Sequence, residues 1–241
     1  MSDKFASNPV VAHRGAFKKK QLPENSIAAL KEAIRLQCTG SEFDVRMTLD
    51  DSLIINHDPH YNKLDIEKTD FATLAQTRLS NGERLPTLRE YLVAGLDNNN
   101  STRLVLEIKP SATKERGRLI AERVLQMVRE LNAETMTVYI SFDYDILKRL
   151  LELDPKVSTQ YLNGDKTPDE LKKDGIAGAD YNISVFRKNP EWVGALRKNK
   201  LILNAWTVND TATIDWLYNN GFHFVTTNEP ELALERFRAR Q

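Results

Sequence analysis

The chain has 241 residues, of which 41% are hydrophobic and 28% are charged, and 34 Lys and Arg balance 34 Asp and Glu. This composition excludes a disordered or fibrous protein, and a zero net charge gives no reason to expect a nucleic-acid partner. One cysteine, Cys38, excludes an intrachain disulfide or a cysteine-ligated metal cluster, and no apolar run is long enough to predict a transmembrane segment.

Short β-rich runs alternate with amphipathic helical patterns along the whole chain. In the first half, strands are expected at 10–13, 42–45, 53–56 and 103–109, and helices at 25–36, 71–76, 88–96 and 112–131. In the second half, strands are expected at 138–142, 157–162, 179–185, 201–208 and 222–227, and helices at 144–153, 168–173, 190–198, 211–219 and 230–238.

This alternation predicts an α/β protein with a parallel sheet. Eight main strand–helix units in 241 residues favour closure into a (β/α)8 TIM barrel over an open sheet. The first strand is not followed by the glycine-rich turn of a dinucleotide fold. We expect a single domain, 1–241, with a short inserted loop region at 59–86 after the second strand region.

Polar residues stand at the ends of several expected strands, where the active sites of such barrels lie. Glu42 and Asp44 are two residues apart and share one face of a strand, as do Glu107 and Lys109. The apolar residues that alternate with these ionisable residues, such as Phe43 and Ile108, would face the surrounding helices. The ionisable side chains are therefore expected to converge inside the mouth of the barrel.

Glu42, Asp44 and Glu107 would repel one another if their carboxylates met in one mouth. A hard divalent cation relieves that repulsion, and all-oxygen ligation favours Mg2+ or Ca2+. The alternative is that these acids form ion pairs with Arg14 and Lys109. Because all three acids stand at adjacent strand ends, the cation site is the favoured hypothesis.

His13 follows the first strand and His57 follows the run at 53–56. A histidine titrates at about pH 6.5 and serves as base or acid near neutrality. Cleavage of a phosphodiester needs a base for the attacking oxygen and an acid for the leaving alkoxide. Two histidines on different loops suit that reaction, and Arg14 and Lys109 would neutralise the phosphate oxygens.

These residues belong to a series of motifs that covers nearly the whole chain and closely resembles the glycerophosphodiester phosphodiesterase family. The matching stretches are Ala12-His13-Arg14-Gly15, Pro23-Glu24-Asn25-Ser26, Glu42-Phe43-Asp44-Val45 with Thr48 and Asp50, Asn56-His57-Asp58, Leu85-Pro86-Thr87-Leu88, Glu107-Ile108-Lys109, Ala205-Trp206-Thr207-Val208-Asn209 and Thr226-Thr227-Asn228-Glu229-Pro230.

The resemblance implies a (β/α)8 barrel, a divalent cation, and hydrolysis of a small glycerophosphodiester to sn-glycerol 3-phosphate and an alcohol. It implies an acid–base pair, a set of metal ligands and a set of phosphate-binding residues. These are, respectively, His13 and His57; Glu42, Asp44 and Glu107; and Arg14 and Lys109.

Two further residues of these motifs have two interpretations each. Glu24 either supports the substrate site from the first loop or is a charge near a helix whose cap is Asn25. Trp206 is either a wall of the substrate pocket or part of the core.

The chain departs from the family in two places. Residues 59–84 are short where many members carry a small inserted subdomain, which puts the preference for the alcohol in doubt. Asn228 stands where many members have Asp, at a position expected to cap a helix, so little catalytic effect is expected.

Two other functions remain open. A lysophospholipase D-like phosphodiesterase acting on lipids would need an apolar groove at the mouth, and the mostly polar loop at 62–84 disfavours it. A barrel that binds its ligand without turnover would lack a histidine or an acid of the set, and none is missing.

The sequence leaves several properties undecided. They are the alcohol, the choice of Mg2+ or Ca2+, the assignment of acid and base, attack by water or by the substrate's own hydroxyl, and the oligomeric state. Residues 1–8 contain no hydrophobic targeting segment. The compartment stays open between the cytoplasm and, after removal of a signal peptide, the periplasm or the exterior.

Overall fold

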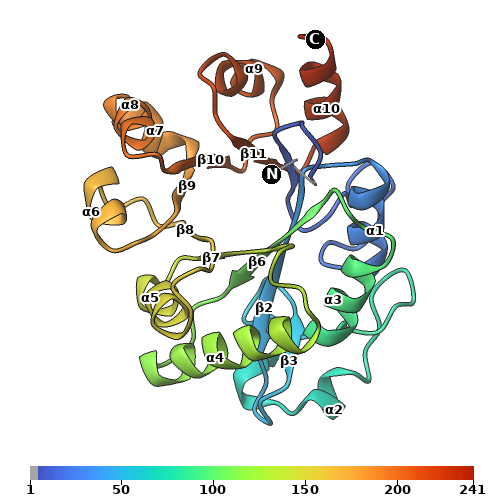
Figure 1. Cartoon of the computed structure of the whole chain (residues 1–241). Coiled ribbons are helices and arrows are strands. Elements are labelled where there is room, and N and C mark those ends of the chain that lie inside the picture. The colour runs from blue at the N-terminus through green and yellow to red at the C-terminus, as the bar shows by residue number, and fades with distance from the viewer. Residues whose placement is uncertain (1–4) are drawn as a thin grey trace.

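The computed structural model describes residues 5–241, and its centre is a closed barrel of parallel strands (Figure 1). The expected (β/α)8 fold is confirmed. The expectation about a targeting segment in residues 1–8 lies partly outside the described residues. The barrel strands are β1 (Val10–Ala12), β2 (Gly40–Met47), β6 (Arg103–Ile108), β7 (Thr137–Ser141), β8 (Thr159–Tyr161), β9 (Gly178–Asn182), β10 (Ile202–Trp206) and β11 (Phe224–Thr227).

Each strand pairs in parallel with the next in chain order, and β1 pairs with both β11 and β2, which closes the ring. Figure 1 shows the helices arranged around this ring. They are α1 (Ile27–Arg35), α3 (Leu88–Leu96), α4 (Lys114–Glu130), α5 (Tyr144–Leu153), α6 (Pro168–Lys173), α7 (Ile183–Lys188), α8 (Glu191–Lys198), α9 (Thr211–Asn219) and α10 (Pro230–Arg238).

The alternation of side chains along β2 and β6 separates the barrel interior from the layer between strands and helices. Phe43 of β2 packs outward on Tyr91 of α3, with ring centroids 4.5 Å apart. Leu104 and Leu106 of β6 belong to the same outer core, whereas Val105 lies in a small inner cluster with Ile140 and others. The predicted faces of both strands are therefore confirmed.

The chain leaves the barrel after β2 and forms a compact segment at its carboxyl end. β3 (Leu53–Ile55) returns antiparallel to β2, as expected from local pairing, and His57 follows it. Residues 59–86 then fold as a hairpin and short helices that the sequence patterns had only partly indicated. They are β4 (His60–Tyr61), β5 (Leu64–Asp65), the 3-10 helix η1 (Ile66–Lys68) and α2 (Phe71–Leu74).

Two local expectations were wrong. The strand expected at 179–185 ends at Asn182, because the Asn182 side chain accepts a hydrogen bond from Ser184 N (3.0 Å) and starts α7. The cap of α1 is Ser26, whose Oγ accepts from Ala29 N (3.1 Å), and not Asn25. Asn25 has a left-handed backbone (φ 59°), a conformation that asparagine adopts more readily than most residues.

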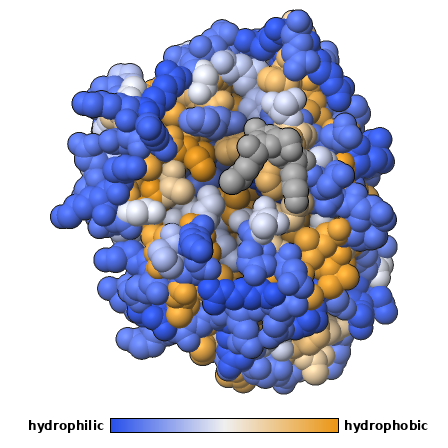
Figure 2. Space-filling model, in the orientation of Figure 1, coloured by the Kyte–Doolittle hydropathy of each residue, from blue (hydrophilic) through white to orange (hydrophobic). Residues whose placement is uncertain are grey.

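Hydrophilic residues cover most of the face that Figure 2 shows, with apolar residues exposed in separate patches. This agrees with amphipathic helices that turn their apolar stripes toward the strands. Within residues 5–241, the structure contains no helix with the length and apolar character needed to cross a membrane.

Candidate active site

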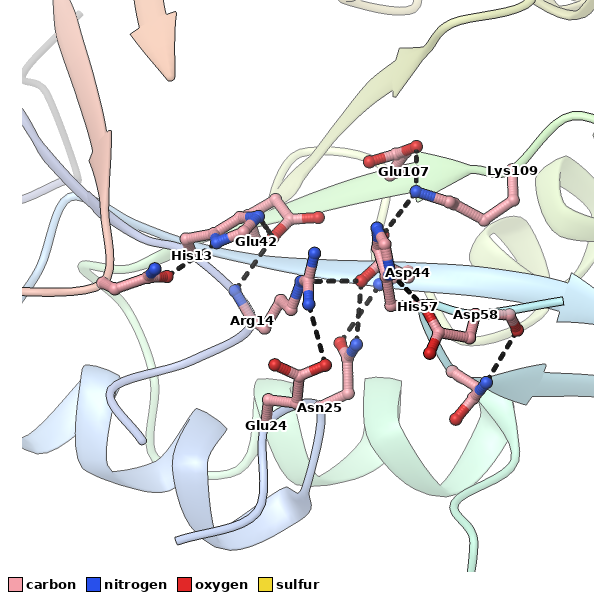
Figure 3. Close-up of polar contacts among 12 residues, drawn as sticks. His13, Arg14, Glu24, Asn25, Glu42, Asp44, His57, Asp58, Glu107 and Lys109 are labelled. Atoms are coloured by element: carbon pink, nitrogen blue, oxygen red, sulfur yellow. Dashed lines mark hydrogen bonds and ion pairs between the residues drawn. The ribbon is translucent and has the colours of Figure 1, made fainter. Parts of the chain in front are cut away.

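The carboxyl ends of β2 and β6 bring three acidic side chains together inside the barrel (Figure 3). The pairing of β2 with β6 places Asp44 directly beside Glu107, and Glu42 lies two residues earlier on the same face. One oxygen from each carboxylate lies within 4.8 Å of the others, and all three residues are buried. The predicted convergence of these acids is therefore present.

The oxygens of this acidic cluster are poorly satisfied by the protein itself. Glu42 Oε1 is buried and has no hydrogen-bond partner. Asp44 Oδ1 and Glu107 Oε1 face the ammonium of Lys109, at 3.2 Å and 2.7 Å. The ammonium of Lys109 thus contacts two of the three buried carboxylates, and the contacts recorded for Glu42 do not include it. A hard divalent cation is the group whose charge and preference for oxygen ligands fit this donor set.

The pKa values of the cluster record the same imbalance. Burial, and then Asp44, raise the pKa of Glu42 well above its ordinary value, and the same causes raise the pKa of Glu107 to about 7. Burial acts in the same direction on Asp44, but Lys109, a hydrogen bond from Asn25 and nearby cations together lower its pKa. The raised pKa values of Glu42 and Glu107 mean that, without a further cation, the three carboxylates are not easily ionised at the same time.

The loop after β1 is fastened to this cluster. Arg14 donates its backbone N–H to Glu42 Oε2 (2.9 Å), and its guanidinium lies 3.6 Å from Asp44 Oδ2. Glu24, an exposed residue, accepts a hydrogen bond from Arg14 Nη1 (2.8 Å). Gly15 lets this loop meet α1, since a Cβ there would lie 2.7 Å from Ala29.

His13, at the end of β1, has an amide as its partner. Its Nδ1 lies 2.7 Å from Asn228 Oδ1, and its Nε2 lies 3.9 Å from Glu42 Oε2. Burial, and then Arg14, lower the pKa of His13 to about 4, so the ring is neutral at neutral pH. The expectation that Asn228 caps a helix is wrong, because the residue at the start of α10 is Glu229 and Asn228 turns toward His13.

His57 has a partner of different chemistry. Its Nδ1 lies 2.8 Å from the carboxylate of Asp58, and this hydrogen bond lowers the pKa of Asp58. Arg46 of β2 donates to the His57 carbonyl (2.9 Å), and Asn56 N donates to Asp44 O (3.0 Å). The loop that carries His57 is thereby joined to the strand that carries the acids.

A cavity of about 110 Å3 joins these groups. Its polar wall is formed by first-half residues that include both histidines, Arg14 and Lys109. Its other wall comes mainly from the second half and is apolar; it is formed by Ile140, Phe142, Leu162 and Trp206. Trp206 packs edge-on against Phe142, with ring centroids 5.4 Å apart, so the pocket-wall interpretation of Trp206 agrees with its position.

The contacts of Asn25 and Asn228 at this site were not predicted from the sequence. Asn25 was read as a helix cap, but its amide donates to Asp44 Oδ2 (2.8 Å) while its Oδ1 accepts from Asp44 N (3.2 Å). The available signal was the pair Asn25-Ser26, since only one of two adjacent capping residues can be the cap. The contact of Asn228 with His13 joins residues 215 positions apart and had no local signal.

Three comparisons relate this geometry to known proteins. A glycerophosphodiester phosphodiesterase from Caldanaerobacter subterraneus subsp. tengcongensis is 28% identical over 246 residues, covering 95% of this chain and 97% of the relative. A crystal structure of a glycerophosphodiester phosphodiesterase from Parabacteroides distasonis matches with a TM-score of 0.94 at 36% identity, covering 98% of this chain and 99% of the other.

A phosphodiesterase from Oleispira antarctica, solved in complex with the product sn-glycerol-3-phosphate, shares the fold with a TM-score of 0.83 at 23% identity, covering 95% of this chain and 96% of the other. The family model of the glycerophosphoryl diester phosphodiesterase family matches residues 13–232. The fold, the matched residues and these relatives agree with the motifs of the sequence. The chain therefore belongs to the glycerophosphoryl diester phosphodiesterase family and is an enzyme of that class.

Proposed function

We propose that the enzyme hydrolyses small glycerophosphodiesters to sn-glycerol 3-phosphate and an alcohol, with a divalent cation, Mg2+ or Ca2+, held by Glu42, Asp44 and Glu107. The observation that carries the metal proposal is the buried acidic cluster, whose three carboxylates outnumber the two cationic side chains that face it, Lys109 and Arg14. When bound, such a cation would polarise the phosphate and lower the pKa of a hydroxyl group close to it.

The phosphodiester would lie between Arg14 and Lys109, both of which line the cavity. The Arg14 guanidinium offers a fork of donors and Lys109 a compact charge, so that together they bind and neutralise the phosphate oxygens. Glu24 would hold the Arg14 side chain in place, and Trp206 would form a wall against the carbon skeleton of the substrate.

In this mechanism His13 is the general base and His57 the general acid. The lowered pKa of His13 and its amide partner Asn228 favour a neutral ring that accepts a proton. The hydrogen bond between His57 Nδ1 and the Asp58 carboxylate fixes the orientation of the His57 ring, which suits a group that donates a proton to the leaving oxygen. His13 takes the proton of the attacking hydroxyl as its oxygen bonds to phosphorus, the bond from phosphorus to the alcohol oxygen breaks, and His57 protonates that leaving oxygen.

The attacking hydroxyl is either the substrate's own 2-hydroxyl, which gives a cyclic phosphate first, or water. Phosphorus NMR during turnover distinguishes these routes, because a transient cyclic glycerol phosphate is formed only in the first.

We also propose that the chain works as one domain, in which residues 59–86 form part of the mouth. Glu67 of this segment accepts a hydrogen bond from Ser111 Oγ (2.7 Å) and pairs with Arg116 of α4 (3.8 Å). The lipid-directed alternative is not favoured, because a cavity of about 110 Å3 is small beside the roughly 300–1,000 Å3 of pockets for drug-sized ligands.

The test is release of glycerol 3-phosphate from glycerophosphocholine and glycerophosphoethanolamine, after EDTA and again with Mg2+ or Ca2+ restored. Release that depends on the cation is the expected result. The variants His13→Ala and His57→Ala should each lose at least about a hundredfold in kcat while keeping their melting temperatures. His60→Ala removes an exposed histidine outside the site and is the control. Near-normal turnover by either site variant would remove that histidine from the mechanism.

A further inference from the structure

A fourth carboxyl group lies inside the barrel and has no part in the mechanism above. Asp180 is on β9, which faces β2 across the barrel, with three strands between them in either direction. It is 1% exposed, yet it lines the same cavity as His13, Glu107 and Lys109. The cavity thus has an acid on the wall opposite the proposed metal ligands.

The surroundings of Asp180 are mainly apolar. Leu162 and Trp206 line the cavity with it, and the Trp206 indole N–H donates to its backbone carbonyl (2.8 Å). Asp180 Oδ1 is buried and has no hydrogen-bond partner. Burial, and then Glu107, raise the pKa of Asp180 far above its ordinary value, against a weaker opposite effect of a hydrogen bond from Asn204. The side chain therefore has a buried oxygen, Oδ1, that no group among residues 5–241 contacts by a hydrogen bond.

A buried acid of this kind is costly for the fold. Leaving a buried polar atom without a partner costs about 1–3 kcal/mol, and an apolar side chain of similar volume avoids that cost. On the neighbouring strand, Asn204 pairs with Thr226 (3.0 Å), whereas Asp180 Oδ1 has no partner and its residue lines the cavity. The lone oxygen is explained if its partner is the ligand that enters the cavity.

The size of the cavity indicates which part of the substrate reaches Asp180. The cavity of about 110 Å3 is small beside the roughly 300–1,000 Å3 of pockets for drug-sized ligands, which suits a three-carbon polyol and not a large alcohol. The apolar wall fits the carbon chain of such a polyol. Its hydroxyl farthest from the phosphate would extend away from Arg14 and Lys109, toward the opposite wall.

We propose that Asp180 recognises the glycerol half of the substrate by a hydrogen bond to its terminal hydroxyl group. This inference rests on the proposed function and adds a residue that determines specificity. Asp180 contributes to binding and orientation, and it takes no part in proton transfer.

The experiment compares two substrates that differ by one hydroxyl. Glycerophosphoethanolamine carries the terminal hydroxyl, whereas its analogue built on 1,2-propanediol lacks it and keeps the 2-hydroxyl. The wild-type kcat/KM should be about tenfold lower for the analogue, because the buried oxygen stays unpaired. Asp180→Val should lower kcat/KM for glycerophosphoethanolamine by the same factor and should no longer distinguish the substrates.

Asp180→Asn is the matched control, because an amide keeps a hydrogen-bonding group of the same shape. This variant should still prefer the glycerol substrate. Asp180→Val should melt no lower than the wild type, since it removes a buried unpaired group; a structural acid would show a clear loss. Calorimetry with sn-glycerol 3-phosphate and 1,2-propanediol 1-phosphate measures the same preference without turnover.

The two failures are distinguishable. If the wild type releases no glycerol 3-phosphate with either cation, the proposed function fails, and the calorimetric comparison still decides the role of Asp180. If the wild type is active but treats both substrates alike, or if Asp180→Val keeps the preference, the role of Asp180 is wrong. A preference lost equally in Asp180→Asn would also overturn the proposal, because the amide keeps a hydrogen-bonding oxygen at the same place.

Discussion

Lys109 and the proposed cation balance the same carboxylates, so removal of the lysine should make the fold depend more strongly on the metal. The Lys109 ammonium lies 2.7 Å from Glu107 and 3.2 Å from Asp44, and all three side chains are less than a tenth exposed. Burial lowers the pKa of Lys109, but Asp44 and Glu107 outweigh this and raise it. The lysine is therefore charged in the native state.

Removing one partner of a buried ion pair costs about 3–5 kcal/mol, because the other charge is left without compensation. For a chain of this length, about 1 kcal/mol corresponds to about 2–4 °C in melting temperature. Lys109→Met should therefore melt about 6–20 °C lower than the wild type in EDTA. A bound cation compensates the buried negative charge that the lysine no longer balances, so Mg2+ or Ca2+ should raise the melting temperature more in the variant than in the wild type.

The assay measures the melting temperatures of both proteins in EDTA and in excess Mg2+ or Ca2+. It does not require either protein to be active. Lys148→Met removes an exposed lysine of α5 and should change neither melting temperature nor the effect of metal. Equal increments in the wild type and in Lys109→Met would refute the reasoning, since the cation and the lysine would then not share the carboxylates.

Two further predictions concern pH. The pKa of Glu32 is lowered from its ordinary 4.5 to about 2, because hydrogen bonds from Arg35 and Lys20 outweigh the opposite effect of burial. The ionised form of Glu32 therefore stabilises the fold at pH values above 4.5, and this stabilisation is lost as the pH falls toward 2. Because the partners of Glu32 are exposed and screened by solvent, Glu32→Gln should lower the free energy of unfolding by only about 1 kcal/mol at neutral pH, measured in urea, and by almost nothing in acid. A loss of stability that is independent of pH would contradict this. Asn228→Asp places a carboxylate beside His13 and should raise its pKa, so that the acidic limb of kcat/KM against pH moves up by about 1–2 units. An unchanged profile would show that Asn228 does not act on this ring.

The fold could be predicted from the sequence because its pattern is local and repeated. Period-two alternation in β2 and β6 indicated which side chains enter the barrel, and the strand ends indicated where they meet. The strand expected at 179–185 was too long. The β-branched side chains of Ile183 and Val185 suggested a strand, but the Asn182 cap starts a helix there.

The contacts of the site were harder to predict, because they depend on which loops meet in space. The Asn228 side chain lies near β1 only after the barrel closes, when His13 N donates to Thr227 O (2.9 Å). Asp180 lies outside the stretches that match the family motifs, and no pattern in its strand, β9, distinguishes it. Its importance becomes visible only when its burial and its unpaired oxygen are known.

The two walls of the cavity come from different halves of the chain, and this division has an evolutionary consequence. The groups proposed to move protons and to balance charge all lie between His13 and Lys109, whereas the apolar wall follows from Ile140 onward. Substitutions in the later strands can thus reshape the space for a new substrate while the reactive groups keep their positions. Asn228 is the exception that joins the halves, so a duplicated gene that diverges in specificity would be expected to keep a hydrogen-bonding side chain there.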